Sequence, residues 1–211
     1  MPRKKEALAE FHKNRILAAA RRLFAEHGEA SASMDDIAAG ADYSKSTVYV
    51  YFTGKEDIFY HLVLQDMRAM QRGIAESLAE NETFQARYFA ICDRLSELSR
   101  GDAEFFPHVF GKIGVDEKDF ERLPVLREIF DTGEETNRLI ERFFSEAVAR
   151  GEAQADVDPV RAGFVFWSSI CALISVSQNK EAYFQKRFAM SREAFLHYGF
   201  ELLLGAVKAG E

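Results

Sequence analysis

The chain has 211 residues, of which 47% are hydrophobic and 29% are charged, and its formal net charge is −7. This balance excludes a disordered or collagen-like chain and fits one domain or two small ones. Two cysteines, Cys92 and Cys171, are too few for a disulfide framework, and no charged-then-apolar leader precedes Leu8. We therefore expect a reduced, cytoplasmic protein. An evenly spread negative charge would argue against nucleic acid as a partner.

The charge is not evenly spread along the chain. Residues 1–60 hold nine basic and nine acidic side chains, so the whole net negative charge comes from residues 61–211. Residues 1–22 alone have a local excess of five positive charges. A basic arm of this kind can contact phosphates, and it can equally be a solvated, frayed terminus.

Apolar residues recur at helical spacing through most of the chain, and no segment alternates apolar and polar residues as a strand does. We therefore predict an all-α fold of about nine helices. The first helix carries apolar residues from Leu8 to Phe24 and stops at Gly28. Ser33 and Asp36 have the spacing of a capping box, which opens a second, short helix.

A turn at residues 41–43 separates this helix from the next. Asp42 tolerates a left-handed backbone there, and Ser44 is placed to cap a third short helix. A longer helix begins at about Lys55 and continues without a flexible linker into the remainder of the chain. Five further helices are predicted over 83–100, 103–113, 122–150, 159–179 and 191–208. We divide the chain into a three-helix domain, residues 1–54, and a second helical domain, residues 55–211.

Residues 33–56 have the spacing of a helix-turn-helix. The second helix of such a motif enters the major groove, so its exposed face needs small polar groups and hydrogen-bond donors. Groups of this kind are supplied by Ser44, Lys45, Ser46, Thr47, Tyr49 and Tyr51. The alternative is that the aromatic residues of this segment are core side chains of a three-helix unit.

This N-terminal segment resembles the DNA-binding domain of the TetR/AcrR family of one-component transcriptional regulators. The positions that match, between residues 10 and 60, are Ile16-Leu17, Leu23-Phe24, Gly28, Ile37-Ala38, Ser44, Thr47-Val48-Tyr49, Tyr51-Phe52, Lys55-Glu56 and Phe59. The resemblance implies a recognition helix over residues 44–52, with phosphate contacts from Tyr49 and Lys55. It also implies that Ser33 and Met34 lie near the opposite phosphate backbone.

Four positions depart from the family pattern. Asp42 and Tyr43 stand where glycine and then valine are usual in the turn, and Ser46 and Val50 stand where glycine and histidine are frequent. An extra carboxylate near DNA is unfavourable. It lowers the affinity that we expect, and Tyr43 and Val50 make the operator sequence unpredictable from relatives.

The last two predicted helices, 159–179 and 191–208, are each apolar on more than one face. The resemblance implies that they pair with their symmetry mates as a four-helix bundle, and the alternative is that they are ordinary core helices. A homodimer suits DNA binding because one recognition helix spans few base pairs. The apolar stretch 162–176 has 15 residues and three serines, which we take as too short to cross a membrane.

Phenylalanine is abundant, with 15 of the 19 residues at or after Phe84. The resemblance implies an effector pocket among the middle helices, and such a pocket would take a lipophilic small molecule. The pocket residues that we predict are Phe89, Phe105, Phe106, His108, Phe110, Phe143, Phe166 and Trp167. A densely packed aromatic core is the alternative for any one of them.

The sequence thus predicts a ligand-responsive DNA-binding regulator, most simply a repressor that binds a palindromic operator as a homodimer. An activator of the same fold and a helical scaffold that binds no DNA are the alternatives. No catalytic, metal-binding or phosphate-cradling motif occurs, so we predict no enzyme activity, metal or cofactor. Asp57 and His61, four residues apart, are interpreted as a helix-surface pair.

Overall fold

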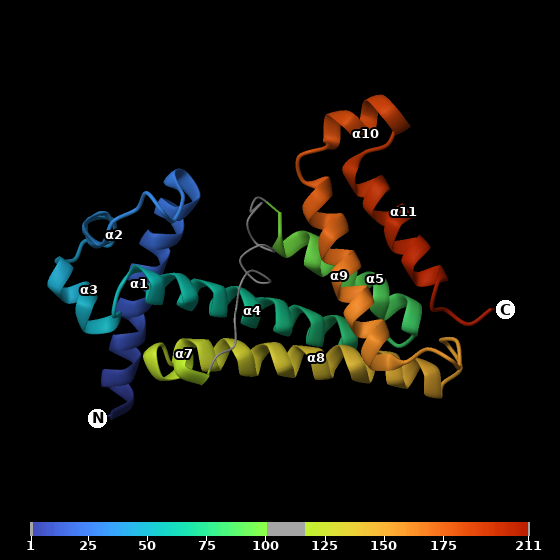
Figure 1. Ribbon diagram of the computed structural model, residues 1–211, viewed down its shortest axis with the longest axis horizontal. Helices are drawn as coiled ribbons and strands as arrows, with labels where there is room; N and C mark the ends of the chain where they lie inside the picture. Colours follow the sequence, from blue (N-terminus) through green and yellow to red (C-terminus); the bar gives the residue numbers. More distant parts are fainter. Residues whose placement is uncertain (1, 101–116, 211) are drawn as a thin grey trace. The chain divides into compact units, whose positions relative to one another are not determined.

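The computed structural model describes residues 2–100 and 117–210, and within them it has ten helices and no strand. The all-α prediction is confirmed. The helices shown in Figure 1 are α1 (Pro2–His27), α2 (Met34–Gly40), α3 (Lys45–Tyr51), α4 (Lys55–Glu80), α5 (Phe84–Leu98), α7 (Glu117–Arg122), α8 (Val125–Ala149), α9 (Pro159–Ser177), α10 (Glu181–Phe188) and α11 (Arg192–Gly205). The helix predicted over 103–113 lies outside the described residues.

The chain divides into two compact units. The first unit comprises Met1–Asp66 with Ile113–Phe130, and the second comprises Met67–Lys112 with Asp131–Glu211. The long helices α4 and α8 each contribute residues to both units. The domain boundary that we place after residue 54 divides the chain by expected function, not by compactness, and it stays a prediction.

The structure differs from the predicted helices in three places. The basic N-terminal segment is helical from Pro2, so it continues α1. The helix predicted to begin at residue 122 is preceded by the separate short helix α7, and α8 begins after Pro124, which cannot continue a helix interior. The helix α10 was not predicted, and its N-cap residue Lys180 makes no side-chain capping bond.

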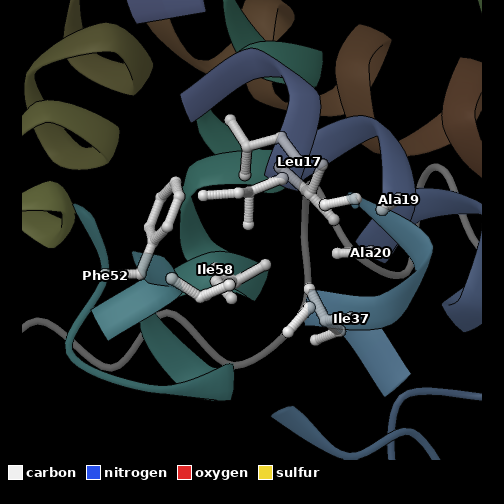
Figure 2. Packing of buried hydrophobic residues seen from close by; sticks show 11 residues of the cluster. Leu17, Ala19, Ala20, Ile37, Phe52 and Ile58 are labelled. Carbon is white, nitrogen blue, oxygen red and sulfur yellow. The ribbon is translucent and has the colours of Figure 1, made fainter. Parts of the chain in front are cut away.

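The core of the first unit is built from small and aliphatic side chains. Alanines on α1 let α2 approach closely, and Ile16, Ile37 and Val48 are completely buried between α1, α2 and α3. Phe52, which ends α3, and Ile58 on α4 close the same cluster (Figure 2). This cluster fixes the angle between α2 and α3, and hence which side of α3 faces outward.

The core of the second unit is aromatic. Phe84 on α5 packs against Phe143 and Phe144 on α8, with ring centroids 4.9 and 5.8 Å away. Tyr88, one turn along α5, contacts the ring of Phe166 on α9. Its hydroxyl donates a 2.9 Å hydrogen bond to the carbonyl of Phe200 on α11. The buried phenol therefore links α5, α9 and α11 with its polar group satisfied.

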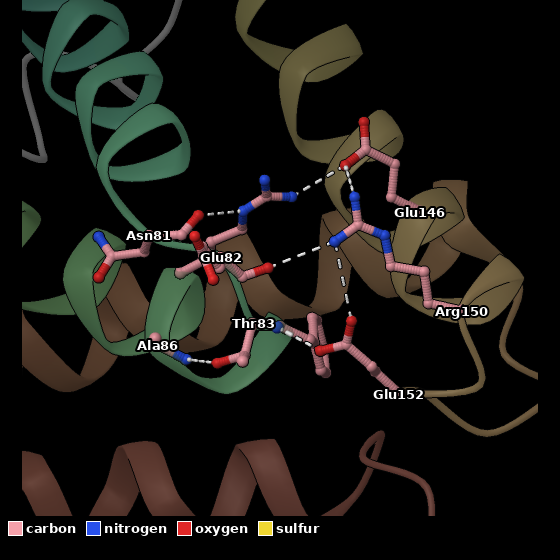
Figure 3. A network of polar contacts seen from close by, with 9 residues as sticks. Asn81, Glu82, Thr83, Ala86, Glu146, Arg150 and Glu152 are labelled. Atoms are coloured by element: carbon pink, nitrogen blue, oxygen red, sulfur yellow. Dashed lines mark hydrogen bonds and ion pairs between the residues drawn. The ribbon is translucent and has the colours of Figure 1, made fainter.

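A polar network holds the start of α5 against the end of α8 within the second unit (Figure 3). Arg87 donates to the carbonyl of Asn81 and to the carboxylate of Glu146, at 2.8 and 2.9 Å. Glu152 accepts a 2.5 Å hydrogen bond from the backbone N–H of Phe84. Thr83 caps the helix by accepting from the N–H of Ala86. The first turn of α5 is therefore anchored to α8 and to the chain that follows it.

The helix α9 is longer than the apolar stretch that was predicted to be too short to cross a membrane. Asp158 caps it and Pro159 begins it, so the predicted 15-residue apolar stretch is part of a helix of 19 residues. By length and composition alone, α9 could cross a membrane. Its buried side chains, among them Phe166 and Ile170, belong to the core of the second unit.

Candidate nucleic-acid interface

The predicted capping box opens α2. The Ser33 hydroxyl accepts a 3.2 Å hydrogen bond from the N–H of Asp36, and the N–H of Ser33 donates to the Asp36 carboxylate at 3.0 Å. Hydrogen bonds from the Ser33 side chain and backbone lower the pKa of Asp36. The Ser33 hydroxyl also donates to Asp36, so the hydroxyl and the backbone N–H of Ser33 both already have partners within the capping box. Met34 is half-buried against the core cluster.

The turn between α2 and α3 is a Schellman motif closed by an aspartate. The N–H of Tyr43 donates to the carbonyl of Ala38 at 2.9 Å, and the N–H of Asp42 donates to the carbonyl of Ala39 at 3.1 Å. Asp42 has a φ of 58°, so the predicted left-handed residue is confirmed. This position usually takes glycine, because other residues meet a steric penalty there that aspartate and asparagine tolerate best.

Three hydroxyls gather at the start of α3. Ser44 caps the helix by accepting from the N–H of Thr47 at 3.1 Å, as predicted. Its Oγ shares 2.8 Å hydrogen bonds with the hydroxyls of Ser46 and Thr47. Ser44 and Ser46 are exposed and Thr47 is half-buried, so the structure brings these predicted groove-facing residues together on one solvent-facing turn.

The exposed side of α3 continues with an aromatic and an aliphatic side chain. Tyr49 is 50% exposed, Val50 is 75% exposed, and the Tyr49 hydroxyl has no hydrogen-bond partner within the described residues. Lys45 extends to the Asp35 carboxylate at 2.7 Å, and this hydrogen bond raises the pKa of Lys45. The face therefore offers a free phenol donor, a cation and an apolar surface, which are groups that contact phosphates and thymine methyls.

The structure separates Tyr51 from this face. Residues two apart on an α-helix point to opposite sides, and Tyr51 is half-buried against the core cluster. Its ring centroid lies 5.6 Å from that of His12 on α1. This placement favours the alternative, a core aromatic residue, for Tyr51, while Tyr49 remains exposed.

Lys55, predicted to contact phosphate, is engaged inside the first unit. Its Nζ donates to the carbonyls of Glu29, Ala30 and Ala32, at 2.7, 3.2 and 3.0 Å. An ammonium group has three protons to donate, so these three carbonyls use all of them. Lys55 thereby holds the loop between α1 and α2, and a phosphate contact would require it to release at least one carbonyl.

Two arginines on α1 also shape this site, although the sequence marked them only as part of a basic segment. Arg15 donates to the carbonyl of Ala41 at 3.0 Å and to the Asp42 carboxylate at 2.9 Å. Arg22, seven residues later and hence on the same face of α1, donates to the carbonyl of Gly40 at 3.1 Å. The seven-residue spacing of Arg15 and Arg22 places both on one face of α1, and this spacing could have indicated that both contact the end of α2.

The predicted effector residues are only partly described. Phe105, Phe106, His108 and Phe110 lie outside the described residues. Phe143 and Phe166 are buried in the aromatic core, and Phe89 lies beside His197 with ring centroids 5.0 Å apart. Trp167 lines a shallow groove between α8 and α9 whose volume, about 40 Å³, holds a few water molecules. The structure thus brings Phe143 and Phe166 together in a packed core and leaves Trp167 at its edge.

Comparison with known proteins bears on this site. The family model described as "Bacterial regulatory proteins, tetR family" matches residues 16–62, which span the α2–α3 motif. The HTH-type transcriptional regulator SrpR of Pseudomonas putida is 23% identical over 174 residues, covering 82% of this chain and 78% of SrpR. The chain belongs to the TetR/AcrR family. It is accordingly a transcriptional regulator of the TetR type, a class whose members are generally not enzymes.

Solved structures of transcriptional regulators share the fold. A regulator of the TetR/AcrR family from Thermobifida fusca is 21% identical, with a TM-score of 0.70 over 91% of this chain and 96% of that one. FadR from Bacillus subtilis, solved in complex with stearoyl-CoA, is 19% identical, with a TM-score of 0.68 over 90% of this chain and 96% of that one. Among the described residues of this TetR-family chain, no cluster of three or more His, Cys, Asp or Glu could hold a metal ion.

Proposed function

We propose that this TetR-family chain is a repressor that binds a palindromic operator as a homodimer and is released by a lipophilic small molecule. The observation that carries the DNA-binding part is the exposed face of α3, where the shared hydroxyls of Ser44, Ser46 and Thr47 lie beside the free phenol of Tyr49. Small hydroxyls permit close approach to base edges, and a phenol donates to a phosphate oxygen.

The other predicted DNA contacts follow from the same arrangement. Lys45 would exchange Asp35 for a phosphate, because both partners are exposed and the pair is weak in water. Met34 would contribute its backbone N–H at the start of α2, and Ser33 would do so after its N–H leaves the Asp36 carboxylate. Tyr51 supports the motif from its inner side, and Lys55 supports it by holding the α1–α2 loop.

A homodimer through α9 and α11 is supported by the side chains that these helices expose. The two helices pack against each other within the second unit, and large apolar residues remain exposed on both. On α9 these include Val165 and Val176, and on α11 they include Tyr198 and Leu202. A contiguous exposed apolar surface is typical of an interaction site. Two copies of the chain would present two recognition helices to successive half-sites.

The effector part of the proposal rests on the aromatic second unit and on a relative. FadR, a protein of the same fold, was solved with stearoyl-CoA, and a long acyl chain requires an apolar cavity. The groove beside Trp167 is too small for such a ligand, so binding would need the packed aromatic residues to separate. Because α4 has residues in both units, a shift of this helix could change the spacing of the recognition helices.

A salt-dependent binding assay with Tyr49→Phe tests the DNA-binding proposal. The probe is a labelled duplex from the region upstream of the gene that encodes this chain. We expect Tyr49→Phe to weaken binding roughly tenfold, since a hydrogen bond to a charged group is lost. The melting temperature should not change, because the hydroxyl has no partner within the described residues. Tyr183→Phe, which alters an exposed tyrosine on α10, is the matched control and should bind as the wild type does.

Two outcomes would contradict the proposal. One is binding by the wild type that does not weaken with salt, since phosphate contacts release counterions. The other is equal loss in Tyr49→Phe and Tyr183→Phe. In the same assay, stearoyl-CoA is the first effector probe, and in vitro transcription from the upstream region separates a repressor from an activator.

A further inference from the structure

The turn of the helix-turn-helix carries a negative charge beside the face that we propose for DNA. Asp42 lies two residues before the cap of α3, and its side chain is 85% exposed. Its φ of 58° is fixed by the Schellman hydrogen bonds of the turn, so the carboxylate cannot move far from α3. A like charge held at an interface with phosphates opposes binding.

One guanidinium, that of Arg15 on α1, pairs with this carboxylate. Nη2 of Arg15 donates to the Asp42 carboxylate at 2.9 Å and to the carbonyl of Ala41 at 3.0 Å. The guanidinium carbon lies 5.0 Å from the ring centroid of Tyr43. The Tyr43 hydroxyl is 2.6 Å from Nδ1 of His12, one turn earlier on α1. Arg15 is therefore held in place by three groups of the turn, which are the Ala41 carbonyl, the Asp42 carboxylate and the Tyr43 ring.

In water this ion pair contributes little to stability, because the Asp42 side chain is largely exposed and that of Arg15 is 41% exposed. The approach of a phosphate backbone changes its importance. Water leaves the interface, the local dielectric falls, and an unpaired carboxylate would repel the phosphates more strongly than it does in solvent. The Arg15–Asp42 ion pair therefore contributes more free energy in the DNA complex than in the free protein.

We propose that Arg15 is a positioning residue for DNA binding, which acts through Asp42 by offsetting the charge of its carboxylate and holding it beside α1. This inference rests on the proposed DNA-binding function. Arg15 thereby compensates for a turn residue that departs from the glycine usual in the family. It need not contact DNA itself.

A double-mutant cycle of Arg15→Gln and Asp42→Asn tests the inference. Asparagine removes the charge but still tolerates the left-handed backbone, and glutamine keeps a helix-favouring side chain on α1. With the upstream duplex as probe, Arg15→Gln should weaken binding roughly tenfold. Asp42→Asn should change binding by less than about threefold. The double variant should recover to within about threefold of Asp42→Asn, because no carboxylate remains to be offset.

Arg22→Gln is the matched control, since Arg22 also donates to a carbonyl at the end of α2 and forms no ion pair with a described residue. Asp42→Asn should not rescue any loss caused by Arg22→Gln. Melting temperatures of all variants identify a loss of binding that comes from unfolding.

A double variant as weak as Arg15→Gln would overturn the inference. If the salt slope also fell by about 0.9 in both variants that lack Arg15, the guanidinium would be a direct phosphate ligand. Wild-type protein without salt-dependent binding would remove the proposed function and this inference together. Binding with no coupling between the two positions would remove the inference alone.

Discussion

The two units of this regulator differ in the side chains that fill their cores. In the first unit, α1, α2 and α3 follow one another within about fifty residues, and small aliphatic side chains fill the space between them. In the second unit, Phe84 contacts residues about sixty positions away, and Tyr88 donates to Phe200. The first arrangement keeps a short helix at a fixed angle through close packing and caps. The second joins distant helices through large rings that fill a wide interior.

This difference suits two tasks. A recognition helix has to keep its outward face constant, and tight packing of Ile37, Val48 and Phe52 with capping at Ser44 achieves that. Large aromatic side chains leave larger volumes when they rotate or separate, so an aromatic interior can open a cavity with fewer displaced residues. If the two regions are independent in this way, a change in the core of one unit should leave the other unit folded.

The largest expected effect comes from removing one buried ring in each unit. Phe52→Ala and Phe144→Ala each remove a side chain that is 1% exposed, and each should lower the free energy of unfolding by about 3–5 kcal/mol. Hydrogen exchange should then show lost amide protection mainly in residues 16–58 for Phe52→Ala and mainly in residues 84–98 and 131–204 for Phe144→Ala. Loss of protection over both units in either variant would mean that the chain unfolds as one cooperative body.

An intermediate effect is expected at Lys55. Lys55→Met removes three hydrogen bonds to the α1–α2 loop, which should lower the free energy of unfolding by about 1–2 kcal/mol. Urea denaturation measures this loss, and the salt slope of DNA binding should stay that of the wild type. A slope lower by about 0.9 with unchanged stability would instead identify Lys55 as a phosphate ligand.

The smallest effect is expected from His61, which lies against Phe52 with ring centroids 5.1 Å apart. Its Nδ1 is 3.1 Å from the Asp57 carboxylate, which also accepts hydrogen bonds from the N–H and hydroxyl of Thr53. Burial opposes charge on both groups, but these hydrogen bonds outweigh it, so the pKa of His61 is raised above 6.5 and that of Asp57 is lowered below 3.8.

The sign of the pH dependence follows from these two directions. The His61 contribution is fully present below pH 6.5 and is lost as the pH rises through the raised pKa, whereas the Asp57 contribution is lost only in acid below 3.8. Relative to the wild type, His61→Gln should therefore lose stability at pH 6, by less than about 1 kcal/mol, and lose less at pH 8. Denaturation at the two pH values measures this, and a larger deficit at pH 8 would reverse the assignment.

Local signals made the first unit predictable from sequence. Serine is a preferred N-cap residue, so Ser33 and Ser44 each indicate the start of a helix. Asp42 is of a residue type that tolerates a left-handed backbone. The structure places all three as predicted. The start of α4 at Lys55 was predicted equally well.

Features that depend on contacts distant in sequence were not predictable. The helix α10 begins at Lys180 without a side-chain cap, so it gives no local signal. Arg15 appeared as one of many basic residues until its partner Asp42, 27 positions away, was brought beside it. The inward position of Tyr51, in contrast, could have been predicted, because helical geometry alone places Tyr51 and Tyr49 on opposite sides of α3.

The ammonium group of Lys55 has a consequence for covalent chemistry. An acylating reagent has to reach the amine nitrogen, and three carbonyls surround Nζ of the half-buried Lys55. Lys45 is exposed, and its Nζ meets a single exposed carboxylate. Lys45 should therefore be modified before Lys55, and the ratio of the two products reports how often the loop between α1 and α2 opens in solution.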